Sequence, residues 1–163
     1  MRRFAVIDTN VVVSGLLSGA ADSPTRRVLD AILAGTIPLV LSESLLAEYR
    51  EVLLRPAIAE RHGLTEAEID IVLEEVVVNA ALREPRSAEP PMAMAETGPA
   101  GASVAAGRAA AAPHGDEHLI ALLTAVPEAV LVTGDHRLAE AVASWCTVAT
   151  PAEFAATLVD QTA

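Results

Sequence analysis

The stretch FAVIDTNVVVSGLL, residues 4–17, decides the fold, because an apolar run stops on three polar residues and then resumes. We expect a buried strand over residues 3–8, followed at once by a helix over residues 10–19 with Asn10 as its cap. Asp8 then stands where a buried strand ends. A carboxylate there loses hydration, which is costly unless a positive charge compensates or the group is protonated. Asp8 therefore either caps the next helix or holds a cation.

The same order of strand and helix recurs along the chain. Apolar spacing and capping residues predict helices over residues 22–35, 43–55, 64–78, 116–126, 136–143 and 151–159. Short apolar runs predict further strands over residues 37–42, 80–84, 129–133 and 146–150. Strands that alternate with helices indicate the α/β class, with a parallel sheet covered by helices on both faces.

One stretch departs from this pattern. Residues 86–113 are rich in Ala, Pro, Gly and Ser and contain almost nothing large to bury. We expect a surface loop or insertion there, with a short Ala-rich helix near AAGRAAAA as the alternative. The length of 163 residues otherwise predicts a single domain over residues 1–163.

Composition narrows the class of protein. The single Cys146 cannot form an internal disulfide, and no apolar run approaches the length of about 18 residues that a membrane span needs. No charged-then-apolar leader is visible. We therefore expect a cytoplasmic protein without membrane association.

The net charge of −11, from 22 acidic and 11 basic residues, argues against a protein that wraps nucleic acid in a general positive field. It does not exclude a nuclease, because carboxylates gathered around divalent cations also appear as excess acid in a sequence. All 11 basic residues are Arg, so any mechanism that needs a lysine is excluded.

Acidic residues recur near the ends of the predicted elements. In parallel sheets ligands bind beyond the carboxyl ends of the strands, and Asp8 and Asp135 both follow predicted strands. Glu48 lies at the border of the apolar stripe of its helix, from which it can reach into a cleft, whereas Glu43 and Glu51 point away. Taken singly, each has a simpler explanation as a helix cap, a turn former or a surface ion pair.

Asp116 and Glu117 stand together at the start of a predicted helix, where they would also stabilise the helix dipole. Four acidic clusters near element ends nevertheless indicate a shared site. Oxygen ligands without Cys or paired His favour Mg²⁺ or Mn²⁺ over zinc, and such sites suit phosphodiester hydrolysis. The three histidines near these acids share no zinc spacing, so we expect ordinary surface residues of which one can contact phosphate: His114, His118 and His136.

Several of these motifs, taken in order, resemble the PIN-domain family. VIDTNVVVSGLL, LSESLLAEYREVL, DEHLIALL, LVTGDHRL and the closing TPAEF carry the resemblance, which covers most of the chain except residues 86–113. The likeness is strongest to the branch of toxin components of toxin-antitoxin systems related to VapC-type toxins. Members of the family commonly carry a further Asp shortly before the Asp116/Glu117 pair, where this chain reads APHGDE.

The resemblance implies a three-layer α/β/α sandwich with a central parallel sheet, a Mg²⁺- or Mn²⁺-dependent ribonuclease that acts on RNA, a homodimer and a cognate antitoxin protein. By position, it also implies a set of catalytic and metal-binding acids, namely Asp8, Glu48, Asp116, Glu117 and Asp135. It further implies three polar supports, namely Thr9, Asn10 and Thr133.

Two other interpretations compete with this one. A phosphatase of the haloacid-dehalogenase type also places Asp after its first strand, but it needs a second Asp two residues later and a lysine. Position 10 is Asn and the chain has no lysine, which excludes that class. A catalytically degenerate PIN fold that acts only as a binding module remains the alternative, favoured by the missing Asp.

Overall fold

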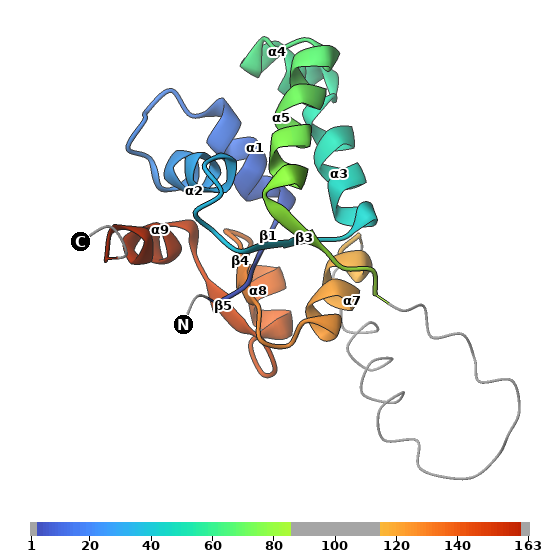
Figure 1. The fold of residues 1–163 in the computed structure, drawn as a ribbon, viewed down its shortest axis with the longest axis vertical. Coiled ribbons are helices and arrows are strands. Elements are labelled where there is room, and N and C mark those ends of the chain that lie inside the picture. Colours follow the sequence, from blue (N-terminus) through green and yellow to red (C-terminus); the bar gives the residue numbers. More distant parts are fainter. Residues whose placement is uncertain (1–2, 86–114, 161–163) are drawn as a thin grey trace, which may run out of the picture.

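The computed structural model describes residues 3–85 and 115–160 of the chain (Figure 1). The predicted loop or insertion at 86–113 lies outside the described residues. Within the described part, no helix is both long and apolar enough to cross a membrane.

The described strands form one parallel sheet in the order β3-β2-β1-β4-β5. The strands are β1 (Ala5–Ile7), β2 (Leu39–Leu41), β3 (Ala80–Leu82), β4 (Val130–Val132) and β5 (Thr147–Ala149). All five match predicted strands. The central strands are buried on both faces, which explains why they appear in the sequence as short, continuous apolar runs.

The helices among the described residues are α1 (Thr9–Leu17), α2 (Pro24–Leu33), α3 (Glu43–Leu53), α4 (Pro56–His62), α5 (Glu66–Val78), α7 (Glu117–Ala125), α8 (His136–Val142) and α9 (Pro151–Asp160). The chain crosses from β1 to β2 to β3 in one direction and from β4 to β5 in the other. Because such crossovers are right-handed, the two directions place their helices on opposite faces. Figure 1 shows α1, α2, α3 and α5 on one side of the strands and α7 and α8 on the other. The predicted three-layer α/β/α fold is confirmed.

The helix starts follow the predicted capping residues closely. The hydroxyl of Ser23 accepts the N–H of Arg26 at 3.3 Å, and the hydroxyl of Ser42 accepts the N–H of Leu45 at 3.1 Å. Thr65 forms a reciprocal capping box with Glu68. These local hydrogen bonds fix where each helix begins.

Two helix boundaries differ from prediction. Helix α1 starts at Thr9 with Asp8 as its capping position, so Asn10 is not the cap but an exposed residue inside the first turn. The sequence analysis assigned no helix to residues 56–62, where α4 lies. Pro56 stops α3 but also occupies the first position of α4, and Gly63 ends α4 with a φ of 68°.

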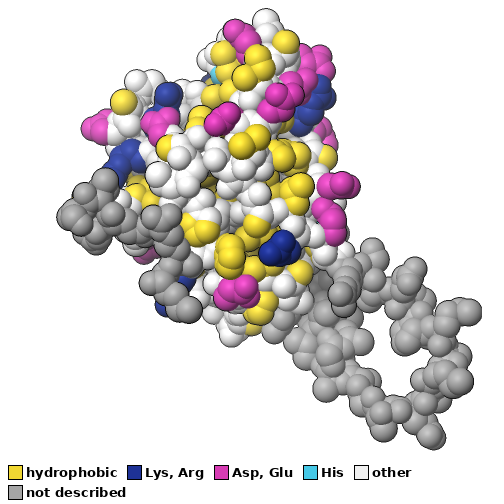
Figure 2. Space-filling view, in the orientation of Figure 1, with side chains coloured by type: hydrophobic (Ala, Val, Ile, Leu, Met, Phe, Trp, Pro, Cys, Tyr) yellow, Lys and Arg dark blue, Asp and Glu magenta, His cyan; other side chains and the backbone are white. Residues whose placement is uncertain are grey.

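The described residues share a hydrophobic core built from the sheet and the helices on both of its faces. Gly15 lets α1 and α2 approach closely, since a Cβ there would lie 2.7 Å from the carbonyl oxygen of Thr25. Not all apolar side chains are covered. Figure 2 shows hydrophobic side chains across the visible face, and the largest exposed ones include Ile71 and Val78 of α5.

Candidate active site

The chain adds β2 and β3 on one side of β1 and β4 and β5 on the other, so the strand order reverses between β1 and β4. The acids that follow β1 and β4 lie at this point. Ile7 pairs with Val132 in the parallel ladder, so the next residues, Asp8 and Thr133, leave the sheet side by side. The N–H of Asp8 donates to the carbonyl of Val132 at 3.0 Å. The place where strand order reverses is where open α/β sheets bind ligands.

The Asp8 side chain is only 5 % exposed and makes no capping hydrogen bond to α1. Its Oδ2 instead accepts the hydroxyl of Thr133 at 2.7 Å. Burial raises the pKa of Asp8 above its ordinary value of 3.8, Glu48 and Asp135 raise it further, and the Thr133 hydrogen bond partly opposes them. Asp8 therefore occupies the capping position of α1, but its buried carboxylate makes no capping hydrogen bond to that helix.

Thr133 connects the acids that follow β1 and β4. While its hydroxyl donates to Asp8, the same oxygen accepts the N–H of Asp135 at 3.0 Å. Asp135 in turn caps α8, because its Oδ1 accepts the N–H of Arg137 at 2.9 Å and that of Leu138 at 3.3 Å. The simpler role weighed for Asp135, a helix cap, is thus present, and the residue also lies close enough to Asp8 to raise its pKa.

Glu48 reaches this edge of the sheet from α3. The hydroxyl of Thr9 donates to Glu48 Oε2 in a short hydrogen bond, and His118 Nε2 lies 3.3 Å from the same oxygen. The Glu48 side chain is 30 % exposed, whereas Glu43 and Glu51 of the same helix are exposed. The predicted position of Glu48 at the rim of a buried face is confirmed.

Tyr49 of α3 is a core residue that also positions the site. Its side chain is fully buried, and its hydroxyl donates to the carbonyl oxygen of Ile7, the residue before Asp8. Burial raises its pKa well above the ordinary value, and the charges of Asp8 and Glu48 add to the shift. The buried phenol needs a hydrogen-bond partner, and this need ties α3 to the end of β1.

Asp116 approaches from the other face of the sheet, at the start of α7. The pKa of Asp116 is raised to about 6, chiefly by burial and further by the charges of Asp8, Glu48 and Asp135, while His118 lowers it. Asp116 makes no capping hydrogen bond to α7. The structure thus brings Asp8, Glu48, Asp116 and Asp135 within electrostatic reach of one another.

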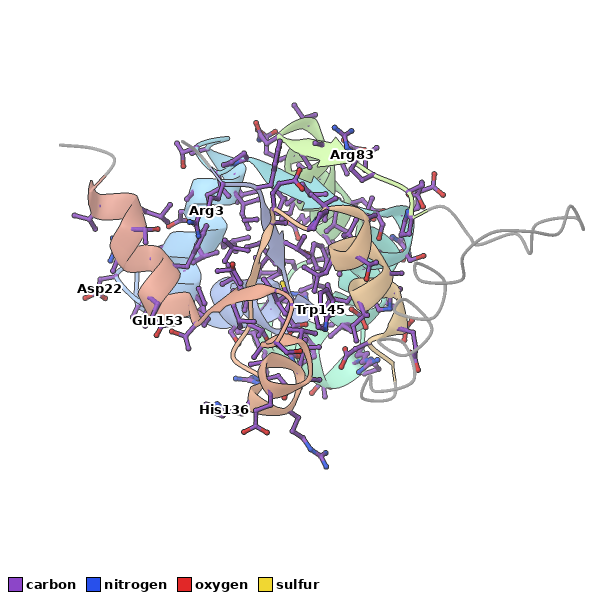
Figure 3. The ribbon with its side chains drawn as sticks, turned by 90° about the horizontal axis from the view of Figure 1, so that it is seen from below. Arg3, Asp22, Arg83, His136, Trp145 and Glu153 are labelled. Atoms are coloured by element: carbon purple, nitrogen blue, oxygen red, sulfur yellow. The ribbon has the colours of Figure 1, made fainter. Side chains whose placement is uncertain are left out.

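Other candidate residues lie less centrally. The Glu117 carboxylate accepts the N–H of Gly115 at 3.0 Å, within its own turn, and the side chain is exposed. His136, labelled in Figure 3, is exposed at the first position of α8, as expected. His118 differs from its predicted surface role, because it is 23 % exposed and contacts Glu48. His114 lies outside the described residues.

The side chains at this edge of the sheet fit a hard divalent cation, because most of them offer buried or half-buried carboxylate oxygens. In the described part of the chain, the basic group beside these carboxylates is His118, which contacts Glu48. Asp8, Glu48 and Asp116 are the acids that would hold such an ion, with Asp135 beside them. In the described ranges, however, no three His, Cys, Asp or Glu side chains already lie close enough to coordinate one ion. Charge therefore favours a cation here, but the side chains are not yet gathered around one.

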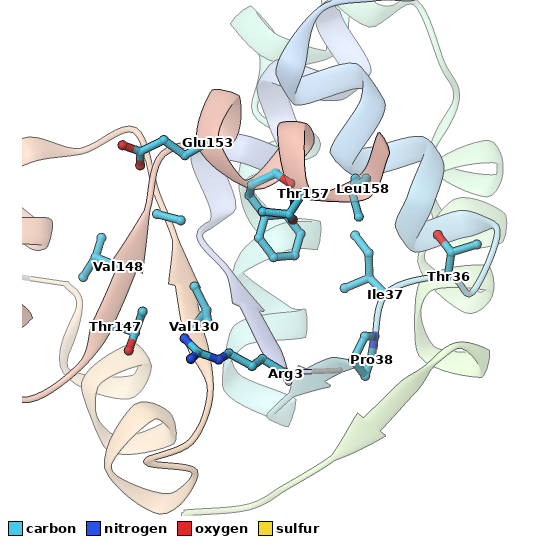
Figure 4. Close-up of a pocket in the computed structure, with 12 residues that line it drawn as sticks. Arg3, Thr36, Ile37, Pro38, Val130, Thr147, Val148, Glu153, Thr157 and Leu158 are labelled. Atoms are coloured by element: carbon cyan, nitrogen blue, oxygen red, sulfur yellow. Dashed lines mark hydrogen bonds between the residues drawn. The ribbon is translucent and has the colours of Figure 1, made fainter. Parts of the chain in front are cut away.

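A hollow lies at the opposite end of the sheet from these acids. It has a volume of about 510 Å³ and lies among residues before β1 and β2, the start of β4, β5 and α9 (Figure 4). Its lining is mainly apolar, with Arg3 and Glu153 at different sides in Figure 4. Glu153 is engaged as a cap, since its carboxylate accepts the N–H of Thr150 at 2.8 Å. The acids of the candidate site contribute nothing to this hollow.

A family model described as PIN domain matches residues 5–137, and the chain therefore belongs to the PIN-domain family. PIN domains are generally nucleases and typically use divalent metal ions, so membership indicates a nuclease that acts on RNA or another nucleic acid. Searches of curated proteins and of solved structures returned no match.

Proposed function

We propose that this chain is a Mg²⁺- or Mn²⁺-dependent endoribonuclease whose catalytic acids are Asp8, Glu48, Asp116, Glu117 and Asp135. The observation that carries the proposal is the buried Asp8, which follows β1 at the switch point of a PIN fold and makes no capping hydrogen bond. A bound divalent cation would supply an activated water and stabilise the leaving oxygen of the phosphodiester.

The polar neighbours of the acids orient them for this task. Thr133 donates its hydroxyl hydrogen bond to Oδ2 of Asp8 and so helps to orient this carboxylate. Thr9 and His118 both contact Oε2 of Glu48, and no other residue of the described ranges hydrogen-bonds to Oε1. Asn10, exposed in the first turn of α1, completes the proposed polar supports.

A binding module without catalysis is the second candidate. It is favoured by the turn of Glu117 toward Gly115 and by the lack, among the described side chains, of three ligands gathered for one ion. The missing Asp before Asp116 points in the same direction. Metal affinity and cleavage separate the two candidates.

The biological setting is also a proposal. The order of motifs along the chain supports the toxin of a type II toxin-antitoxin pair, VapC-like, with a cognate antitoxin and a homodimeric state. A cytoplasmic location fits the single Cys146, whose half-buried thiol has a pKa raised by burial and is thus less reactive. Co-purification with the product of a neighbouring small gene, and a measured mass of the free chain, would test these assignments.

Cleavage of a labelled single-stranded RNA in Mn²⁺, compared with the same reaction in EDTA, tests the enzymatic proposal. Glu48→Gln removes a charge from the site, whereas Glu43→Gln removes one from the exposed face of the same helix. We expect cleavage that EDTA stops, that Glu48→Gln lowers at least about tenfold and that Glu43→Gln leaves unchanged. No cleavage in any divalent metal, with no tight Mn²⁺ binding, would favour the binding module.

A further inference from the structure

A second hollow, of about 380 Å³, adjoins the acidic site, and several polar side chains stand on its mainly apolar lining. Its walls come from four elements: Asn10 and Ser14 of α1, Thr25 of α2, Gly134 and Asp135 after β4, and Pro151 at the start of α9. The volume falls within the range of about 300–1,000 Å³ that is usual for small-molecule sites. Asp135 belongs both to this hollow and to the acidic site, so a ligand in one is next to the other.

Three polar side chains face this hollow without using their hydrogen-bonding capacity on the described part of the chain. Asn10 and Ser14 lie one helical turn apart on α1, so they share a face. Neither they nor Thr25 makes a side-chain hydrogen bond to another described residue. A Cβ built on Gly134 would meet no atom within 4 Å, which shows that the space beside the β4 exit is open.

Close packing of α1 on α2 holds the two hydroxyl groups at the same hollow. A Cβ on Gly15 would lie 2.7 Å from the Thr25 carbonyl oxygen and 2.9 Å from the Leu29 Cβ, so only Gly permits this approach. Ser14 precedes Gly15 on α1, and Thr25 is itself the residue of α2 that Gly15 contacts. The hydroxyls therefore belong to a fixed junction between helices.

If the chain binds RNA, the residues that line this hollow indicate which part of a nucleotide fits there. A phosphate is disfavoured, because the lining has the Asp135 carboxylate and no Lys or Arg. A stacked base is disfavoured, because no aromatic side chain lines the hollow. A sugar hydroxyl both donates and accepts hydrogen bonds, and so do Ser and Thr hydroxyls and the Asn amide.

We propose that this hollow holds the ribose of a nucleotide next to the scissile phosphate, and that Ser14 and Thr25 bind its 2′-hydroxyl. The inference rests on the proposed ribonuclease function and adds to it the basis of selection for RNA over DNA. The 2′-hydroxyl is the group by which a protein distinguishes the two nucleic acids at a given position. Val11 and Pro151 supply apolar contacts beside it.

A deoxyribose scan of the substrate tests the contact. A series of otherwise identical RNA oligonucleotides carries one 2′-deoxynucleotide at each position around the cleaved bond. With the wild-type chain, we expect one position to lower kcat/KM by about five- to tenfold, the value of one or two hydrogen bonds. In Ser14→Ala/Thr25→Val, the same substitution should change kcat/KM by less than about twofold, because the protein partners are gone.

The control is Ser44→Ala, which removes an exposed helical hydroxyl outside the hollow and should keep the full deoxy effect. An undiminished deoxy effect in the Ser14→Ala/Thr25→Val variant overturns the inference while leaving the ribonuclease proposal intact. If no RNA is cleaved, the proposed function fails instead.

A measurement without cleavage then decides the inference alone. In NMR titrations with adenosine 5′-monophosphate and its 2′-deoxy form, the amide signals of Ser14 and Gly134 should shift more with the ribonucleotide. Equal shifts with both nucleotides, or none, would refute the ribose site.

Discussion

Asp8 and Asp70 both have an ordinary pKa of 3.8, yet their surroundings move this value in opposite directions. Burial, with Glu48 and Asp135 nearby, raises the pKa of Asp8. Hydrogen bonds from Arg50 lower the pKa of the partly exposed Asp70, whose Oδ1 lies 2.8 Å from the Arg50 Nε. Among the described residues, Arg26, Arg50 and Arg55 thus pair with surface acids, whereas no arginine pairs with Asp8, Glu48 or Asp116. The site retains uncompensated negative charge, which a cation can neutralise.

The substitution Asp8→Asn should have the largest effect, because it removes the buried charge that distinguishes Asp8 from Asp70. It keeps the shape of the side chain and removes the buried charge, so RNA cleavage should fall at least about 100-fold, because even outer partners of metal ligands are worth about 10- to 100-fold. The melting temperature should stay within about 5 °C of the wild type or rise, since a desolvated charge is lost. Cleavage assays and thermal melts check both. Wild-type cleavage rates at matched Mg²⁺ would remove Asp8 from the site.

The pH dependence of Asp116 should give the next largest effect. With a folded pKa of about 6 and an ordinary value of 3.8, Asp116 binds a proton more tightly in the folded state. Its contribution to stability is therefore fully present below pH 3.8 and is lost as the pH rises through 6. Metal-free wild type should lose more stability between pH 4 and pH 7 than Asp116→Asn does. Denaturant melts at several pH values measure this difference.

Metal binding by Asp116 should follow the same titration with the opposite sign, because protons compete with the cation for the carboxylate oxygens. Mn²⁺ affinity should fall as the pH drops below about 6. If denaturant melts show that wild type and Asp116→Asn lose the same stability between pH 4 and pH 7, the pKa of Asp116 is not raised in the folded protein.

Glu117 distinguishes a metal ligand from a residue of the local turn. Its carboxylate accepts the Gly115 N–H, so it must turn to join the other acids. If Glu117 is a direct ligand, Glu117→Ala should bind Mn²⁺ more weakly than the exposed control Glu51→Ala does, by about 1 kcal/mol or more. Calorimetric titration of both variants measures the gap. Equal affinities would mean that Glu117 is no metal ligand and only stabilises the start of α7.

Asp70→Asn should have the smallest effect. It breaks the exposed contact with Arg50 and leaves the acidic site untouched. We expect unchanged RNA cleavage and a slight loss of thermal stability that salt at about 1 M abolishes, because exposed ion pairs are strongly screened. Melts at low and high salt test this, and any loss of cleavage would mean that the two regions communicate.

The sequence was sufficient to predict the strands and most helix starts, because buried parallel strands are continuous apolar runs and caps such as Ser23 and Thr65 act locally. It was also sufficient to place Asp8 and Asp135 at strand ends and Glu48 at a helix border. These predictions depend only on period and position along single elements.

The remaining features of the site depend on contacts between distant elements. Nothing local indicates that the Tyr49 hydroxyl reaches the Ile7 carbonyl or that His118 meets Glu48. A fully buried Tyr must find a partner, so Tyr49 carried a usable signal. Helix α4 carries a usable signal too, because Pro56 suits the first position of a helix and Gly63 suits its end.

The strand order also has a consequence for synthesis of the chain. The site needs Asp8 from the first strand exit and Thr133 from the fourth, which are joined by a hydrogen bond across 125 positions of sequence. A nascent chain that has not yet released β4 from the ribosome lacks the Thr133 hydroxyl that hydrogen-bonds to Asp8. Contacts between such distant positions also form late in folding, since closing a long loop precedes any gain. If the proposed ribonuclease function holds, we expect a growing chain to gain activity toward RNA only after β4 has been made.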